Sequence, residues 1–347
     1  MTMRKIVACA LVLGSGAGVA NADATANVEG YFGAAFGSFD GNGIFQTADG
    51  KSSTGLTESS YVFVYDLDVT VSATGTSDSG LTFGASIDID DAATAQGPIS
   101  DLGSAGEIFV AGDFGTLAMG DIDDAAESVV GDLAGVGLTG LGDFNEMLYL
   151  VTSGAEYAGS PVALYTYRSG HMTLAFAFTD DRGWSAGGEY GGDFWDVGLA
   201  YESVQSGATI TLRDPGDLDH IPNSPALSVI APDNAHQTIA QGAVRLAGVT
   251  LKGAYGLIDA QGEADLAQYG VSAEYGWSGW TVAAYFREAD TDFDDPATSD
   301  IKDRFYGLGA TYDLGGGLLL AGGVAVWDFD DLPSEYVVGD FGISFNF

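Results

Sequence analysis

The last twelve residues, 336–347, constrain the fold of this chain more than any other segment. Their sequence, YVVGDFGISFNF, alternates strictly, and one face consists of Val337, Gly339, Phe341, Ile343, Phe345 and Phe347. Such alternation is typical of a β-strand, because successive side chains of a strand point to opposite faces. A strand with one continuous apolar face that ends the chain on an aromatic residue predicts the closing strand of a bacterial outer-membrane β-barrel.

The first 22 residues have the layout of a secretory signal peptide. Two basic residues precede an apolar run, and small residues follow it. Cleavage is predicted after Ala22, with Ala24 and Ala26 as alternatives. The single cysteine lies in this segment, so residues 23–347 are predicted to form neither a disulfide nor a thiolate metal site.

The chain is extremely acidic, with 49 Asp and Glu against 11 Lys and Arg and a formal net charge of −38. This charge excludes nucleic acid as a partner, because nucleic-acid binding depends on basic residues. Disorder is not expected, since 46% of the residues are hydrophobic and 12% are aromatic. After the signal peptide no apolar run approaches the ~20 residues of a transmembrane helix. The apolar residues must therefore be dispersed along strands.

Alternating runs broken by turns give sixteen predicted strands. They are 28–36, 61–71, 81–89, 107–111, 116–120, 162–168, 172–179, 185–190, 194–203, 236–246, 249–259, 266–275, 280–288, 305–314, 318–328 and 336–347. An even number of strands, with tight turns at one end and longer loops at the other, is the layout of a transmembrane antiparallel barrel. We therefore predict an all-β fold with one barrel domain, 23–347. The alternative, a soluble β-sandwich, is disfavoured by the signal peptide and by the polar inner faces.

Charged residues in the predicted strands oppose the aromatic face. A charge that faces lipid near the midplane costs roughly 2–4 kcal/mol, whereas a charge that faces a water-filled lumen costs little. We therefore assign to the pore wall Asp66, Asp68, Asp88, Arg168, Arg245, Lys252 and Arg287, and the parity of Asp196, Glu202, Glu274 and Asp340 is the same. Arg304 is an exception, because it shares a face with Tyr306 and Leu308, and we expect it to meet lipid phosphates at the outer rim.

A long acidic stretch, about 121–160, interrupts the strands. Its carboxylates are Asp121, Asp123, Asp124, Glu127, Asp132, Asp143 and Glu146, and apolar residues lie between them. A fully exposed loop would not need those apolar residues. Folded inside a barrel, they would pack on one wall while the carboxylates narrow the pore into a charged constriction.

Calcium is a second hypothesis for four of these residues, Asp121, Asp123, Asp124 and Glu127. Hard cations prefer such oxygen ligands, although acidic clusters are more often simply solvated. No other cofactor is expected. The three histidines lie near no nucleophile motif, so the sequence does not predict an enzyme.

Several segments together resemble a known family. SGLTFGASIDID, GEIFVAGDFGTLAMGD with the acidic DDAAESVVGDL after it, PVALYTY, FYGLGATYDLGGG and the terminal Phe347 are similar to the general diffusion porins of Gram-negative bacteria, especially the Rhodobacter type. The resemblance implies a sixteen-stranded barrel, a homotrimer among outer-membrane lipid and lipopolysaccharide, and a third loop folded inward. It also implies a cluster of arginines facing that loop, but the first two predicted strands carry Asp66 and Asp68 and no arginine.

These observations predict a water-filled outer-membrane channel for passive diffusion of small hydrophilic solutes and ions, with a preference for cations. A substrate-specific channel for a small sugar or organic ion is the main alternative. A barrel that serves only as a surface adhesin or phage receptor is a third hypothesis.

Overall fold

The computed structural model describes residues 22–39, 42–43, 60–89, 106–152, 162–179, 183–205, 209–213, 227–230, 234–330 and 335–347. Residues 1–21 of the predicted signal peptide and the end of the acidic stretch, 153–160, lie outside the described residues. Cleavage after Ala22 therefore stays a prediction.

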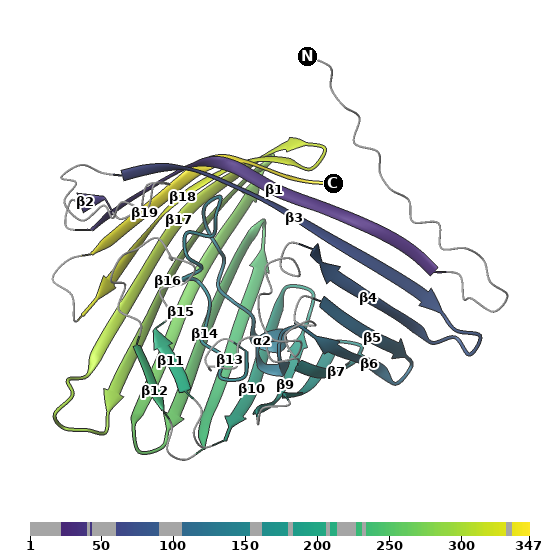
Figure 1. The fold of residues 1–347 in the computed structure, drawn as a ribbon, viewed down its shortest axis with the longest axis horizontal. Helices are drawn as coiled ribbons and strands as arrows, with labels where there is room; N and C mark the ends of the chain where they lie inside the picture. The colour runs from purple at the N-terminus through teal and green to yellow at the C-terminus, as the bar shows by residue number, and fades with distance from the viewer. Residues whose placement is uncertain are drawn as a thin grey trace.

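Sixteen antiparallel strands form one closed barrel, which confirms the predicted fold class (Figure 1). The strands are β1 (Ala22–Phe39), β3 (Ser60–Thr76), β4 (Thr82–Asp88), β5 (Gly106–Gly112), β6 (Gly115–Gly120), β7 (Val162–Ser169), β8 (Met172–Thr179), β9 (Gly183–Gly191), β10 (Trp195–Val204), β13 (Ala235–Leu246), β14 (Val249–Ala260), β15 (Ala264–Trp277), β16 (Trp280–Phe293), β17 (Ile301–Gly315), β18 (Leu318–Phe329) and β19 (Tyr336–Asn346). A two-residue strand, β2 (Asn42–Gly43), extends the same sheet beside β1.

The terminal strand closes the barrel, as its sequence predicts. β19 pairs antiparallel with β1 from Glu29 opposite Asn346 to Phe39 opposite Tyr336. Val28 and Phe347 add two backbone hydrogen bonds, of 2.9 and 3.0 Å, beyond the end of that ladder. Closure leaves neither strand with an unpaired edge along this register, as a sheet in lipid requires.

Glycines and left-handed residues form the tight turns. Between β13 and β14, Ala247 and Gly248 have φ of 52° and 81°, and between β15 and β16, Ser278 and Gly279 have φ of 48° and 84°. Two consecutive residues with positive φ match the right-handed twist of a hairpin. The predicted turns at these positions are therefore present.

Several strands extend beyond their predicted ends. β16 continues from the predicted end at residue 288 to Phe293, where acidic residues break the apolar alternation but the backbone pairing with β17 and β15 continues. The stretch after β10, expected to be a loop, contains a hairpin of β11 (Thr209–Arg213) and β12 (Leu227–Ile230). Ile210 of β11 is fully buried in one cluster with Leu148 and Leu266.

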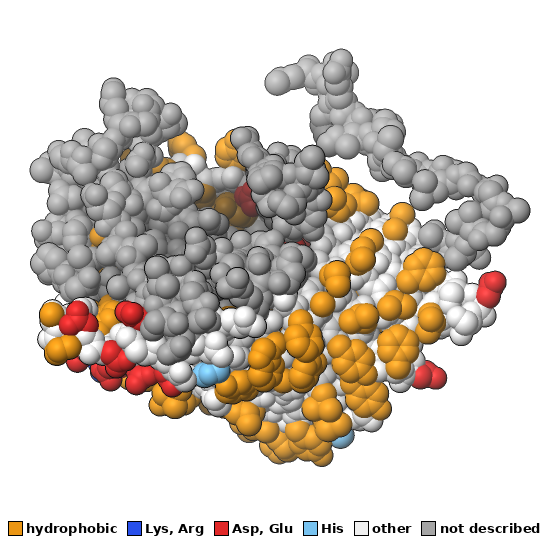
Figure 2. Space-filling view, turned by 60° about the horizontal axis from the view of Figure 1, so that its bottom comes forward, with side chains coloured by type: hydrophobic (Ala, Val, Ile, Leu, Met, Phe, Trp, Pro, Cys, Tyr) orange, Lys and Arg blue, Asp and Glu red, His pale blue; other side chains and the backbone are white. Residues whose placement is uncertain are grey.

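Hydrophobic side chains occupy the outer face of the barrel, and Figure 2 shows them spread over one side of it. Phe63, Leu199, Val271, Leu308 and Phe341, from five different strands, are all more than half exposed. The buried apolar residues gather in three clusters, each of which includes residues of the segment 121–152. None of the described helices is long and apolar enough to cross a membrane.

A charge on this outer face should destabilise the barrel. Val271 is exposed in the middle of β15, so we expect Val271→Arg to lower the free energy of unfolding in lipid vesicles by about 2–4 kcal/mol. Thr70→Arg on β3, at a position with the inward parity of Asp68, should cost less than about 1 kcal/mol, because the charge enters a wet lumen. Denaturant titration of the refolded proteins measures both, and equal costs would contradict the assignment of faces.

Candidate functional site

The acidic segment 121–152 packs against buried side chains of the barrel strands along its length. It leaves β6 and forms α2 (Ala125–Val130), which contacts β8, β9, β10 and β13 (Figure 1). On the return, Phe144 stacks on Phe305 of β17 with ring centroids 4.7 Å apart and lies 4.3 Å from the ring of Trp327. These partners lie on the face opposite the exposed apolar residues.

Hydrogen bonds join the two legs of the segment to each other. Leu133 N donates to Asn145 O at 3.2 Å, and Met147 N donates to the Asp132 carboxylate at 2.9 Å. Near the two ends of the segment, Thr152 Oγ1 donates to the Glu127 carboxyl at 2.7 Å. The segment is therefore a folded unit with a structure of its own.

Glycines of the wall give the segment room to approach the strands. A Cβ atom on Gly323 of β18 would lie 2.8 Å from Gly137 N, and one on Gly309 of β17 would lie 2.9 Å from Val136 Cβ. A Cβ on Gly270 of β15 would clash with Leu133 Cδ1. Gly33, Gly187, Gly198 and Gly342 face the segment in the same way. These glycines mark a track, the glycine track, along which added side chains would collide with the segment.

Polar residues of the wall anchor the segment along this track. Asp340 of β19 accepts hydrogen bonds from Leu138 N at 2.8 Å, Thr139 N at 2.7 Å and Thr139 Oγ1 at 2.9 Å. Gln268 of β15 accepts from Leu148 N at 2.8 Å and donates to Leu148 O at 2.7 Å. Asp340 has the predicted inward parity, but it is buried and serves as an anchor.

Glu202 of β10 and Gln237 of β13 complete the set of anchors. The Glu202 carboxyl accepts from Val151 N at 3.0 Å, and Gln237 Nε2 donates to Leu148 O at 2.8 Å. Sequence reasoning missed the two glutamines. Their signal was present, because each is a polar residue on the face opposite the exposed apolar residues of its strand.

The predicted wall cations are largely engaged by the segment or by other acids. Arg287 is only 8% exposed and lies over the Phe305 ring, with 5.2 Å from Cζ to the ring centroid. Lys252 Nζ donates to Val130 O at 2.5 Å, at the end of α2. Arg245 forms an ion pair with Asp196, while Arg168 is exposed at the end of β7. Arg287 is thus buried beside Phe305, the ring on which Phe144 of the segment stacks.

The predicted acids divide by exposure. Asp121, Asp123, Asp143 and Glu146 are exposed, and Glu127 and Asp132 are half-buried. Asp124 is fully buried and caps α2, since its Oδ1 accepts from Glu127 N at 2.8 Å. It is therefore placed as a structural residue of the segment.

Strands β3 and β4 of the wall also carry acidic residues. Asp66 of β3 is exposed, and Asp68 and Asp88 of β3 and β4 are half-buried. Asp66 lies opposite Tyr31 of β1, and a Cβ on Gly33, two residues further along β1, would contact Leu138 of the segment, so the segment meets the wall close to Asp66. Residues 22–120 include one basic residue, Lys51, which lies outside the described residues.

Crowding and burial raise the pKa of carboxyls in the segment. Burial raises the pKa of Glu127 to about 8; its hydrogen bond with Thr152 opposes the shift, and Asp123 and Asp132 add to it. Glu146 is exposed overall, but partial desolvation of its carboxyl, with Asp132 and Asp143 nearby, raises its pKa to about 7. Burial likewise raises the pKa of Asp123 and of Asp132. The segment therefore carries less charge at neutral pH than its composition suggests.

Calcium binding at Asp121, Asp123, Asp124 and Glu127 stays a prediction. Within the described ranges, no three His, Cys, Asp or Glu residues are grouped so that they could hold a metal ion. Asp124 and Glu127 instead use oxygens to bind hydrogen donors of the segment itself.

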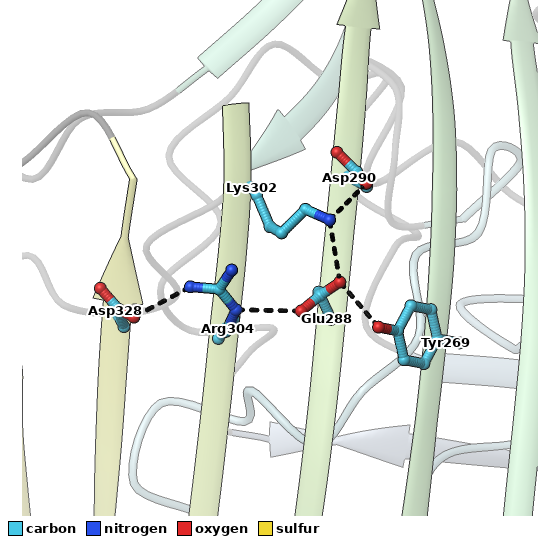
Figure 3. A network of polar contacts seen from close by, with 6 residues as sticks. All are labelled: Tyr269, Glu288, Asp290, Lys302, Arg304 and Asp328. Carbon is cyan, nitrogen blue, oxygen red and sulfur yellow. Dashed lines mark hydrogen bonds and ion pairs between the residues drawn. The ribbon is translucent and has the colours of Figure 1, made fainter. Parts of the chain in front are cut away.

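Arg304 lies in a charged network on the outer face (Figure 3). Its Nε donates to Glu288 at 3.0 Å and its Nη1 to Asp328 at 3.2 Å, from strands on either side. Lys302 is 2.7 Å from Asp290 and 3.4 Å from Glu288, which also accepts from the Tyr269 hydroxyl at 2.7 Å. Three carboxylates thus compensate two cations, and contact of Arg304 with lipid phosphates stays a prediction.

Comparisons with known proteins agree on one family. The sequence profile of the Gram-negative porin family matches residues 8–332. The chain is 32% identical over 289 residues to a porin of Rhodobacter capsulatus, which covers 79% of this chain and 89% of the relative.

Solved structures share the fold. A porin refined at 1.8 Å resolution superposes with a TM-score of 0.69 and 25% identity, covering 94% of this chain and all of that one. An anion-selective porin of Comamonas acidovorans superposes with a TM-score of 0.63 and 15% identity, over 94% of this chain and 100% of that chain.

The glycine track can be tested by adding one methyl group. Gly323→Ala places a Cβ against the backbone of Gly137, so we expect the segment to shift, the single-channel conductance to change and stability to fall by about 1–3 kcal/mol. Gly276→Ala is the matched control, because the nearest atoms to its Cβ are 4.0 Å away. Conductance and thermal unfolding that respond equally in both variants would show that the track does not hold the segment.

Proposed function

Since this chain belongs to the Gram-negative porin family, we propose that its outer-membrane channel lets small hydrophilic solutes and ions diffuse passively and favours cations over anions. The chain is a channel rather than an enzyme, as its family and fold indicate. The preference for cations rests on the charges of this chain.

One observation carries the proposal. The segment contacts β1 beside the strand that carries the exposed Asp66, and its own exposed carboxylates include Asp143, while Lys252 binds Val130 O and Arg287 is buried. A water-filled passage bordered by one sign of charge lowers the free energy of counter-ions and raises that of co-ions. Carboxylates of the segment and of the wall therefore border the passage together, whereas the family resemblance implies arginines on the wall.

The inner-face contacts of the segment support its role as the constriction. Its anchors extend from Glu202 on β10 to Asp340 on β19, and we therefore propose that the open passage lies on the side of β3 to β7. The fold alone does not determine the sign of selectivity, because an anion-selective porin has a similar barrel at 15% identity. We assign selectivity to the side chains that border the passage.

The assembly follows from the family as an expectation. We propose a homotrimer in the outer membrane, surrounded by lipid and lipopolysaccharide. The acidic rows on the inner faces suit a general channel, and a channel specific for a small sugar or organic ion is the alternative.

Neutralising the exposed acids should weaken the preference for cations. We expect the channel with Asp121→Asn, Asp123→Asn, Asp143→Asn and Glu146→Gln together to show a cation-to-anion permeability ratio lower by roughly fivefold or more, because a charge about 8 Å from an ion in water contributes about 0.5 kcal/mol. Reversal potentials in a KCl gradient measure the ratio. Asp328→Asn on the outer face is the control and should leave it unchanged. Chloride preference in the unmodified channel would contradict the proposal.

The preference should also depend on pH. A carboxyl is neutral below its pKa and negative above it, so Glu146, with a pKa of about 7, and Glu127, with a pKa of about 8, gain charge as the pH rises from about 6 to 9. We expect the cation-to-anion permeability ratio to increase over this range. Glu127→Gln with Glu146→Gln should flatten the profile, and a profile that is unchanged in the double variant would assign the titration to other groups.

A further inference from the structure

Two buried carboxyl groups meet where the segment leaves the wall and returns to it. Asp124 begins α2, and Glu202 lies on β10, and both are fully buried. One oxygen of each carboxyl group accepts a hydrogen bond from a backbone N–H of the segment. Asp124 Oδ1 accepts from Glu127 N near the start of the segment, and Glu202 Oε1 accepts from Val151 N near its end.

The other two oxygens have no donor. Asp124 Oδ2 and Glu202 Oε2 are buried and without a hydrogen-bond partner among the described residues. The two carboxyl groups lie beside each other, because Ala125 N, next to Asp124, donates to Ser185 Oγ at 3.0 Å and Ser185 is the cross-strand neighbour of Glu202. An ionised carboxylate is only an acceptor. Two ionised groups here would leave both oxygens unsatisfied and place two like charges side by side in a dry site, which is strongly unfavourable.

The surroundings offer little positive charge to offset such a pair. The cross-strand neighbours of Glu202 are Ser185 on β9 and Gln237 on β13, both neutral, and β8 presents Ala175 and Ala177. The titratable groups that the segment adds are Asp123, Glu127 and Tyr149, none of them a cation. Lys252, the cation that contacts α2, binds Val130 O at the other end of the helix.

We propose that Asp124 and Glu202 share one proton, and that this proton fastens the constriction segment to the barrel wall. Glu202 carries the proton and donates a hydrogen bond to Asp124 Oδ2, while Asp124 Oδ1 accepts from Glu127 N at the start of α2. Both carboxyl groups are positioning residues, since neither is exposed to the passage. Loss of the proton would set two carboxylates against each other and push α2 away from β10.

The inference relies on the place of the segment in the proposed function but not on cation selectivity. Infrared spectroscopy of the purified full-length channel tests it directly. At about pH 9, above the pKa of about 8 of Glu127, we expect the C=O band of a protonated carboxyl to persist in the unmodified protein. Most of its intensity should be lost in Glu202→Gln and in Asp124→Asn, whose amides supply the missing hydrogen.

Asp196→Asn is the matched control, because Asp196 lies on the same face of β10 but forms an ion pair with Arg245. It should keep the band. A missing band in the unmodified protein at about pH 9, or a band of equal intensity in Glu202→Gln, would overturn the shared proton, whatever the ion selectivity of the channel.

A second measurement tests the fastening itself. Raising the pH until the band disappears should increase open-channel current fluctuations severalfold in the unmodified protein, because the segment is released. Glu202→Gln should remain quiet over the same range, since its amide does not titrate. Equal fluctuations in both proteins would show that the pair does not hold the segment.

Discussion

The structure depends on a closed β-sheet, in which no strand has an unpaired backbone edge. In lipid each strand must satisfy its N–H and C=O groups on both sides, and the pairing of β1 with β19 removes the last unpaired edge. A closed sheet has only an outside and an inside. Because side chains alternate along each strand, every residue is committed to lipid or to lumen, which explains why Phe341 and Asp340 differ so completely in exposure.

The inward face is then available to hold a second structural element. Gly270, Gly309 and Gly323 have no side chains and so leave room for the segment against the wall. Gln268 and Asp340 form hydrogen bonds with the backbone of the segment. A barrel with a uniformly bulky inner face could not hold a folded segment so closely. The interior therefore combines two patterns in the same strands: small residues that give room and polar residues that bind.

Sequence predicts the first level of this organisation well and the second poorly. Alternation is local, with a period of two residues, so sixteen strands and their faces can be read directly, and the pairing of β19 with β1 follows from the closing strand. Parity assigns a residue to a face but does not reveal what covers it. Parity predicts an inward Arg287, and composition predicts a solvent-facing Asp124 in the acidic stretch, but both side chains are buried. The path of the segment that covers them depends on contacts between residues far apart in the chain, such as Leu138 and Asp340.

The same distinction separates the charge of the chain from the charge that an ion meets. Of the acids in and around the segment, Asp340 and Asp124 bind backbone N–H groups, and Glu127 is largely neutral near pH 7 because its pKa is about 8. Such carboxyls hold the segment in place, and only the exposed ones remain to act on solutes. Acidic residues thus have two roles in this chain. Buried carboxyls anchor the segment, whereas exposed carboxylates provide the charge that acts on solutes. Selectivity can then change through the exposed acids without disturbing the anchors that shape the passage.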